Sequence, residues 1–355
     1  MSAPDTGKVI GGVFGFECPA LSNNGVSLPF AGAHDQVQYF LNFRCALKVL
    51  CDAQRPRAAW LPSYLCEALL RPFTHNQIPI HYYPVDSSLK TVNHDWIEEL
   101  HPGDLVIVIH YFGFANSSFP AARVASKGAL LVEDASQALF LPQQFSESAC
   151  IVYSPRKFLP VPEMGVMASR SDTGTEAAML AAPPDHWWKS AIAMMQKRRD
   201  FDLVGGNNEW FSLFQQVESQ FPLGSYAPSD LSKMLLTCGT DYEHIRARRR
   251  ENYFRLREKL EGYAMFSHMG ENTIPLGFPV LVDPRRRDGI LRRLYEKRIY
   301  PPVHWRINGI VPPEFCASHT VSNSIMTLIC DQRYTLEDMD RQAWEFTRAK
   351  EMSAE

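Results

Sequence analysis

The sequence predicts an α/β protein, with a large domain built on a mainly parallel sheet flanked by helices and a smaller C-terminal α/β domain. Short apolar runs bounded by polar turns alternate with segments of helical spacing; the clearest are Leu105–His110, Ala129–Val132 and Cys150–Tyr153. Runs of this kind are typical of strands buried on both faces of a parallel sheet. Their alternation with helices predicts right-handed crossovers between neighbouring strands.

The first half of the chain divides into short elements. Apolar residues recur at helical intervals over residues 35–53 and predict a helix there, with a break near Asn42. Pro62 ends the next strand, since proline cannot donate a hydrogen bond to a sheet. The further elements expected before Leu105 are a strand over 58–61, a helix over 67–73 and a strand over 78–83.

The domain boundaries follow from changes in composition. Residues 1–34 are rich in Gly, Pro, Ser and Asn and predict an irregular arm, and residues 35–227 form the large domain with a helical insertion at about 172–222. Residues 228–355 form the smaller domain. Its expected elements are a long helix over 228–262 with a weak point at Cys238-Gly239, helices over 286–297 and 336–350, and strands over 277–282 and 325–330.

Composition excludes several classes of function. The net charge is −3 and no basic tract is long, so nucleic acid is not an expected partner. Eight cysteines contain no CxxC pair, and neither they nor the eleven histidines show zinc spacing, so no metal site is expected. No apolar run reaches the roughly 18 residues of a membrane span and no secretion signal is visible, which predicts a cytoplasmic protein without a membrane partner.

Lys157 and Asp134 are the most informative residues. Each follows an apolar strand, so both are expected at the carboxyl edge of the sheet, where open α/β sheets bind ligands. An amine and a carboxylate held there suit pyridoxal phosphate (PLP): the lysine forms a Schiff base with the aldehyde and the acid keeps the ring nitrogen protonated. The simpler alternatives are a solvated surface lysine and an acid that caps a helix.

Further polar residues are candidates for holding the same cofactor. Gln137 lies one helical turn beyond Asp134 and would reach the ring hydroxyl, and Ser154 would bind the phosphate. Arg44 and Cys45 would open a helix whose N-terminus faces the phosphate. A plain polar helix residue, a turn-forming serine and an ordinary helix start are the alternatives for these positions.

Aromatic and basic residues near strand ends are candidates for the ring face and the substrate. Tyr64 would lie over the cofactor ring, as would Tyr111 or Phe112, although core packing is the alternative for each. In the small domain His304, Arg306 and Arg333 are candidates for binding an anionic substrate group. Structural salt bridges are the alternative for the two arginines.

With these residues in place, the chain resembles the DegT/DnrJ/EryC1/StrS family of sugar aminotransferases, which are PLP enzymes of fold type I. The resemblance extends from roughly Asn42 to Met339. Leu131–Ala138, with its Asp-Ala-Ser-Gln run, looks like the family's most specific signature, and Tyr153–Val166 is similar to its Schiff-base segment. Three further segments also resemble the family: Trp60–Cys66, Val303–Trp305 and Met326–Leu336.

The chain departs from the family at several cofactor-binding positions. Val152 replaces the serine five residues before the lysine, and Ser154 stands three residues before it instead. The other departures are Glu163-Met164-Gly165 for a longer glycine run, Ser225-Tyr226-Ala227 for Asn-Tyr-Arg, and Arg44-Cys45 for Gly-Thr. These differences concern the phosphate and the sugar, and they leave Lys157 and Asp134 in place.

The resemblance implies a homodimeric aminotransferase that takes an amino group from glutamate and passes it to a keto-sugar or nucleotide-linked keto-sugar. The substrates would be small molecules on both sides of the reaction. A PLP enzyme of another reaction type or with a non-sugar substrate is one alternative. A degenerate fold that binds a ligand without turnover is the other.

Overall fold

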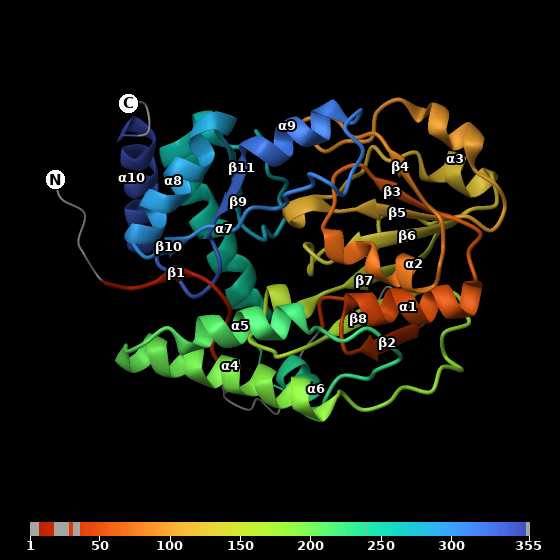
Figure 1. The fold of residues 1–355 in the computed structure, drawn as a ribbon, viewed down its shortest axis with the longest axis horizontal. Coiled ribbons are helices and arrows are strands. Elements are labelled where there is room, and N and C mark those ends of the chain that lie inside the picture. The colour runs from red at the N-terminus through yellow and green to blue at the C-terminus, as the bar shows by residue number, and fades with distance from the viewer. Residues whose placement is uncertain (1–6, 18–27, 31–35, 239, 353–355) are drawn as a thin grey trace.

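The computed structural model describes residues 7–17, 28–30, 36–238 and 240–352 (Figure 1). Most of the arm expected over residues 1–34 therefore lies outside the described residues, as does Gly239. None of the helices in the described ranges is long and apolar enough to cross a membrane.

The centre of the molecule is a mixed, mainly parallel sheet, as the sequence predicted. Within the described residues it has seven strands in the order β2-β8-β7-β6-β5-β3-β4. The pairs from β4 to β7 are parallel, whereas β8 pairs antiparallel with both β7 and β2. The bounds are β2 (Gln36–Phe40), β3 (Ala59–Pro62), β4 (Ile80–Tyr83), β5 (Leu105–Ile109), β6 (Leu130–Ala135), β7 (Ser148–Tyr153) and β8 (Gly165–Ser169).

Helices and short turns cover this sheet. All five residues of β5 are buried, because the strand lies in the middle of the sheet with apolar layers on both faces. The covering elements that follow the strands are α1 (Phe43–Gln54), η1 (Glu67–Leu69), α2 (Arg71–His75), η2 (His94–Glu99), η3 (Tyr111–Gly113), α3 (Ala121–Ser126) and η4 (Pro155–Lys157).

The helix expected to start at residue 35 was wrong in its first part. Residues Gln36–Phe40 form strand β2, in register with β8 through Tyr39–Val166 and Phe40–Gly165. The chain turns at Leu41-Asn42 and only then becomes helical. Pairing with β8 decides the structure, because a strand that completes a sheet overrides a weak local periodicity.

The C-terminal part has its own core. The long helix expected over 228–262 is broken as predicted, and α6 and α7 lie on either side of the break. Strands β9 and β11 pair antiparallel, and the helices pack around them. The elements are α6 (Asp230–Thr237), α7 (Tyr242–Leu260), η5 (Glu261–Tyr263), β9 (Phe278–Leu281), α8 (Pro284–Glu296), β10 (Ile299–Tyr300), α9 (Cys316–Ser324), β11 (Ile325–Leu328) and α10 (Leu336–Met352).

A helical hairpin lies below the C-terminal part and to the left of the sheet in the view of Figure 1. Its helices α4 (Asp185–Val204) and α5 (Glu209–Ser219) lie side by side, drawn in green in Figure 1. Trp187 Nε1 donates to the Val217 carbonyl at 3.0 Å and joins the two helices. The N-terminal strand β1 (Ile10–Gly11) pairs with β10, and Arg198 of α4 donates to the Gly11 carbonyl at 2.8 Å. The described arm thus links the hairpin to the C-terminal part.

Gly165 is where β8 passes the start of α1, and this contact gives a stability prediction. A Cβ added at Gly165 would lie 2.3 Å from the Asn42 carbonyl carbon, whereas one at Gly262 would meet no atom within 4 Å. We expect Gly165→Ala to lower the free energy of unfolding by about 1–3 kcal/mol or more through overpacking. Gly262→Ala should change it by less than about 1 kcal/mol. Urea unfolding measures both, and equal stability of the two variants would contradict this packing.

Candidate active site

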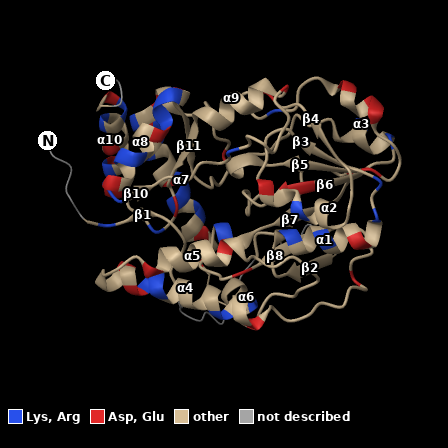
Figure 2. Ribbon diagram, viewed as in Figure 1, with Lys and Arg blue, Asp and Glu red and all other residues tan. Residues whose placement is uncertain are grey.

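Parallel pairing of β6 and β7 brings Lys157 and Asp134 to the same edge of the sheet. Asp134 lies opposite Val152 in the register, and Lys157 follows the end of β7 by one turn of 3-10 helix. The Lys157 amine donates to Ser136 Oγ at 3.2 Å, just beyond Asp134 in the chain. Figure 2 shows acidic residues on β6, where Glu133 and Asp134 lie, within a sheet that otherwise carries few charges. The predicted meeting of this lysine and this acid is present.

Two opposing influences act on the pKa of the Lys157 amine. Burial lowers the pKa of the Lys157 amine below its ordinary value, because an ammonium ion loses hydration there. The Asp134 carboxylate acts in the opposite direction and favours the charged form. The side chain still keeps some exposed surface and lines a cavity. A nucleophilic lysine has these properties.

Asp134 is held in a buried but hydrogen-bonded position. Its side chain is only 5% exposed, and Oδ1 accepts the Ser136 N–H at 2.8 Å. Burial raises the pKa of the Asp134 carboxyl, while Lys157, the Ser136 hydrogen bonds and His110 lower it. His110 lies behind it and contacts Glu133 Oε2 through Nε2 at 2.8 Å. The carboxylate is therefore available to pair with a cation that binds beside it.

Gln137 is fully buried and only half satisfied. Its Oε1 accepts the Phe112 N–H at 2.9 Å, which fixes the orientation of the amide. Its Nε2 has no hydrogen-bond partner in the described structure. A buried amide donor without a partner costs free energy, so its presence indicates a group that arrives with a ligand.

Three arginines gather at the start of α1 and were not recognised together from the sequence. We call Arg44, Arg71 and Arg156 the arginine cluster. The guanidinium groups of Arg44 and Arg156 each lie over the ring of Phe221, at 4.6 and 4.8 Å from its centre. Arg71 donates to the Phe221 carbonyl at 3.5 Å. Burial and the two neighbouring arginines lower the pKa of Arg44 to about 10.

This cluster adjoins a helix N-terminus that carries no acid. The first turn of α1 has no acidic residue, and among the residues that the structure describes Arg156 pairs with one carboxylate, that of Glu218 at 2.8 Å. Positive side chains beside a helix N-terminus are typical of a phosphate site. Arg44 thus lies where the sequence predicted it, whereas residues 71 and 156 join it only through the folding of the chain.

The two other residues predicted to bind the phosphate, Cys45 and Ser154, differ in whether their polar groups are already bonded. The Cys45 N–H donates to Asn42 Oδ1 at 2.9 Å as part of the helix cap, and its Sγ lies 3.6 Å from the Pro222 carbonyl oxygen. Cys45 is therefore engaged within the chain. Ser154 precedes η4, is nearly buried and makes no capping hydrogen bond, so its hydroxyl is not committed to that turn.

Tyr64 is fully buried and joins two parts of the chain. Its hydroxyl donates to the His304 carbonyl and accepts the Trp305 N–H at 2.9 Å. Its ring lies 5.9 Å from Tyr111 and 5.6 Å from Trp305, both in tilted contacts. Tyr64 therefore positions the segment that carries His304, and stacking of its ring on a cofactor remains a prediction.

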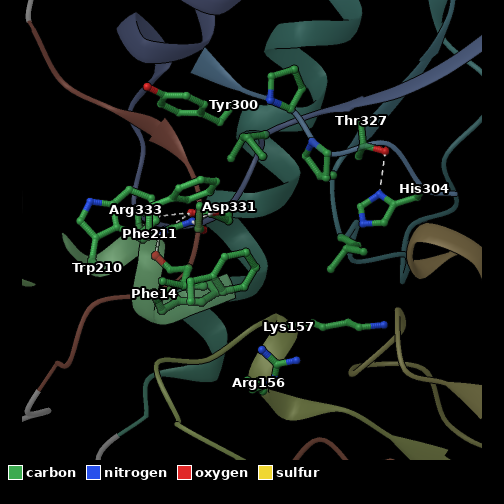
Figure 3. A pocket seen from close by; sticks show the side chains of 18 of the residues that line it. Phe14, Arg156, Lys157, Trp210, Phe211, Tyr300, His304, Thr327, Asp331 and Arg333 are labelled. Atoms are coloured by element: carbon green, nitrogen blue, oxygen red, sulfur yellow. Dashed lines mark hydrogen bonds and ion pairs between the residues drawn. The ribbon is translucent and has the colours of Figure 1, made fainter. Parts of the chain in front are cut away.

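A cavity of about 680 Å³ opens beside Lys157 (Figure 3). Its size suits a small organic ligand. His304 lines it, with Nδ1 2.9 Å from Thr327 Oγ1. Burial and the charge of Lys157 lower the pKa of His304 to about 3, so its imidazole is neutral near pH 7.

The two arginines proposed for the substrate occupy different places. Arg333 lines the cavity, but it pairs with Asp331 at 2.8 Å and also donates to the Gly12 and Val13 carbonyls. Arg306 is 59% exposed, pairs with Asp288 and is not among the cavity's lining residues. The structure thus shows the salt bridges that were the alternative for both.

The side chains present fit PLP. The Lys157 amine suits its aldehyde, and the Asp134 carboxylate suits its ring nitrogen. The unpartnered amide of Gln137 suits the ring hydroxyl, and the arginine cluster at the helix start suits the phosphate. No cluster of three or more His, Cys, Asp or Glu side chains in the described residues is arranged to hold a metal ion.

Comparison with known proteins gives the fold. No family model matches the sequence, and no curated protein matches it. Similar solved structures include the aminotransferase TlmJ from Streptoalloteichus hindustanus, with TM-score 0.65, 16% identity and coverage of 90% of this chain and 87% of that one. The PLP form of the putative sugar aminotransferase Spr1654 from Streptococcus pneumoniae is also similar, with TM-score 0.65 and 12% identity. The similarity covers 90% of this chain and 88% of that one.

DesI, solved in the presence of its TDP-sugar product, gives a TM-score of 0.66 at 16% identity, over 90% of this chain and 83% of that one. These similarities confirm the fold predicted from the sequence, that of the fold type I aminotransferases. At such low identities they show the arrangement of the chain alone.

Burial and Asp134 shift the pKa of Lys157 in opposite directions, and this opposition can be tested. Asp134→Asn removes a negative charge that favours the ammonium ion, so the pKa of Lys157 should fall further and its acylation by a trace of acetic anhydride should reach half-maximum at a lower pH. Peptide mass spectrometry of Lys157 measures this midpoint. Glu147→Gln, at an exposed site, should leave it unchanged. A midpoint that rises or stays constant in Asp134→Asn would show that the two groups are not coupled.

Proposed function

We propose that this chain is a PLP-dependent aminotransferase that passes an amino group from an amino acid, glutamate by resemblance, to a keto-sugar. The observation that carries the proposal is the Lys157 amine beside Asp134 at the carboxyl ends of neighbouring parallel strands. Lys157 lines a cavity, and the amide of Gln137, three residues beyond Asp134, has an unpartnered buried donor. The fold shared with the putative sugar aminotransferase Spr1654, and with DesI, solved in the presence of its TDP-sugar product, supports it.

Each residue has a defined task in this proposal. Lys157 would hold the cofactor's aldehyde through its amine and would act as the general base that moves a proton at the substrate. Asp134 would pair with the ring nitrogen, and Gln137 Nε2 would donate to the ring hydroxyl. The bound PLP supplies an electron sink for the carbanion. His304, neutral and next to Lys157, is positioned to donate a hydrogen bond to the substrate.

The arginine cluster and Ser154 are proposed to hold the phosphate. We assign Cys45 no contact with the phosphate, because its N–H and its thiol bond within the chain. Arg306 and Arg333 would act on a substrate anion only after leaving Asp288 and Asp331. For this reason we assign the contact with the substrate to His304 and not to the two arginines.

Family membership, assembly and location belong to the same proposal. The motifs around Asp134 and Lys157 support a divergent member of the DegT/DnrJ/EryC1/StrS family, which implies a homodimer. The acceptor is a keto-sugar, either free or nucleotide-linked; the TDP-sugar product named for DesI supports the linked form. The expected location is the cytoplasm, and the domain boundaries near residues 35 and 228 are part of the proposal.

A single turnover tests the reaction itself. Protein reconstituted with PLP and mixed with glutamate, without any acceptor, should release up to one equivalent of 2-oxoglutarate per chain, because the amino group remains on the cofactor. Lys157→Ala should release less than about 1% of that in the same time, since general acid–base catalysis typically contributes 10²–10⁴-fold. Lys127→Ala, a surface lysine paired with Glu98, is the control. Equal release by the two variants would reject the assignment of Lys157.

The phosphate assignment is tested by comparing PLP with pyridoxal, which lacks the phosphate. Arg44→Met should weaken PLP binding by about 10–100-fold, the usual effect of a charged hydrogen bond, and should leave pyridoxal binding within about twofold. Arg248→Met, which alters an exposed arginine paired with Glu251, should affect neither. Absorbance titration measures both affinities. Equal weakening for the two ligands would place Arg44 outside the phosphate site.

A further inference from the structure

Six of the residues that line the cavity carry aromatic rings. The α4–α5 hairpin, the N-terminal arm and the α8–β10 region all contribute to it. We call these residues the aromatic wall: Phe14, Trp210, Phe211, Phe214, Tyr295 and Tyr300. Figure 3 shows Phe14, Trp210 and Phe211 grouped beside Asp331 and Arg333, with Tyr300 apart from them and Lys157 and His304 elsewhere around the space.

Two of these rings are unusually exposed for their type. Phe211 is 46% exposed and Tyr295 is 42% exposed, although both line the same cavity. Each has a ring neighbour, Trp210 at 5.7 Å from Phe211 and Tyr300 stacked at 5.5 Å on Tyr295. Apolar surface left open in a concave site is typical of a place that a ligand covers.

The aromatic wall also contains an unused donor. Trp210 is 5% exposed, and its Nε1 has no hydrogen-bond partner among the described residues. The guanidinium of Arg198 lies over the same ring at 4.6 Å and fixes it from behind. The Trp210 ring, held by Arg198 and next to the exposed ring of Phe211, forms a surface suited to stacking.

Two arginines near the aromatic wall are held in ion pairs. Arg333 pairs with Asp331, and Arg198 pairs with Asp202 at 2.9 Å. Arg249 also lines the cavity and donates to the carbonyls of residues 275 and 276, while its Nη2 has no partner in the described structure. Its side chain is 0% exposed, so this side of the cavity presents no solvent-exposed, unpaired cation to a diphosphate among the described residues.

We propose that the aromatic wall is a subsite for an uncharged ring carried by the acceptor, held by stacking and without contacts to phosphate groups. The identity of the acceptor as a sugar rests on the proposed function. The subsite itself rests on the rings and on the ion pairs that Arg333 and Arg198 form with Asp331 and Asp202. An aryl group attached to the sugar and a nucleobase share this chemistry. The hairpin helix α5 then determines which acceptors are accepted.

Calorimetric titration of the PLP-loaded protein tests this with four probes: glucose, phenyl β-glucoside, uridine and UDP-glucose. At least one ring-bearing neutral probe should bind about fivefold or more tightly than glucose, the effect of one favourable ring contact. UDP-glucose should bind within about twofold of uridine at both low and high salt, since no phosphate is held. The tighter of phenyl β-glucoside and uridine identifies the kind of ring.

The matched variants are Phe211→Ala and Phe254→Ala. Phe254 is 42% exposed on α7 and does not line the cavity. Phe211→Ala should remove most of the ring preference, Phe254→Ala should retain it, and Phe211→Leu should fall between them. Circular dichroism and unfolding temperature confirm that each variant is folded.

Three results would overturn the proposal. If neither ring-bearing neutral probe exceeds glucose, no ring subsite exists. If UDP-glucose binds about tenfold or more tightly than uridine and loses this advantage at high salt, a diphosphate is held after all. If Phe211→Ala halves the mass in solution and leaves every affinity unchanged, the exposed ring serves contact between copies. Heat is measured without turnover, so a failed amine transfer would remain a separate result.

Discussion

The site depends on one electrostatic arrangement: a lysine amine and a carboxylate of opposite charge, held at neighbouring strand ends where water is scarce. Burial alone would drive Lys157 and Asp134 to their neutral forms, and each opposes that tendency in the other. The parallel register of β6 and β7 sets this pair, because it brings the two chain segments to the same edge of the sheet. A shift in that register would separate the groups and end the chemistry.

The rest of the fold supports this pair from two sides. Strand β8 passes so close to the first residues of α1 that only glycine fits at position 165, and this contact fixes where the helix begins. The arginine cluster gathers at that helix start, around Phe221. On the other side Tyr64 bonds to the His304–Trp305 segment and holds the C-terminal part against the sheet. Arg156 from the first support and His304 from the second both line the cavity.

Local sequence was sufficient for the buried strands and for the lysine and acid that follow them, because both depend on short-range patterns. Local sequence did not predict the strand Gln36–Phe40, because pairing with β8 decides its structure. It also did not decide the role of Arg333, which forms an ion pair with Asp331 in the folded chain. The arginine cluster was missed because its members are far apart in sequence and meet only through Phe221. The aromatic wall was missed for the same reason, since three separate segments form it.

Borohydride reduction of the PLP-treated protein, followed by peptide mass spectrometry, tests the role of Lys157 most directly. We expect one reduced pyridoxyl group per chain, covalently attached to Lys157, and its loss in Lys157→Ala. Attachment spread over surface lysines, or no attachment at saturating PLP, would contradict that role and favour a fold that binds a ligand without turnover.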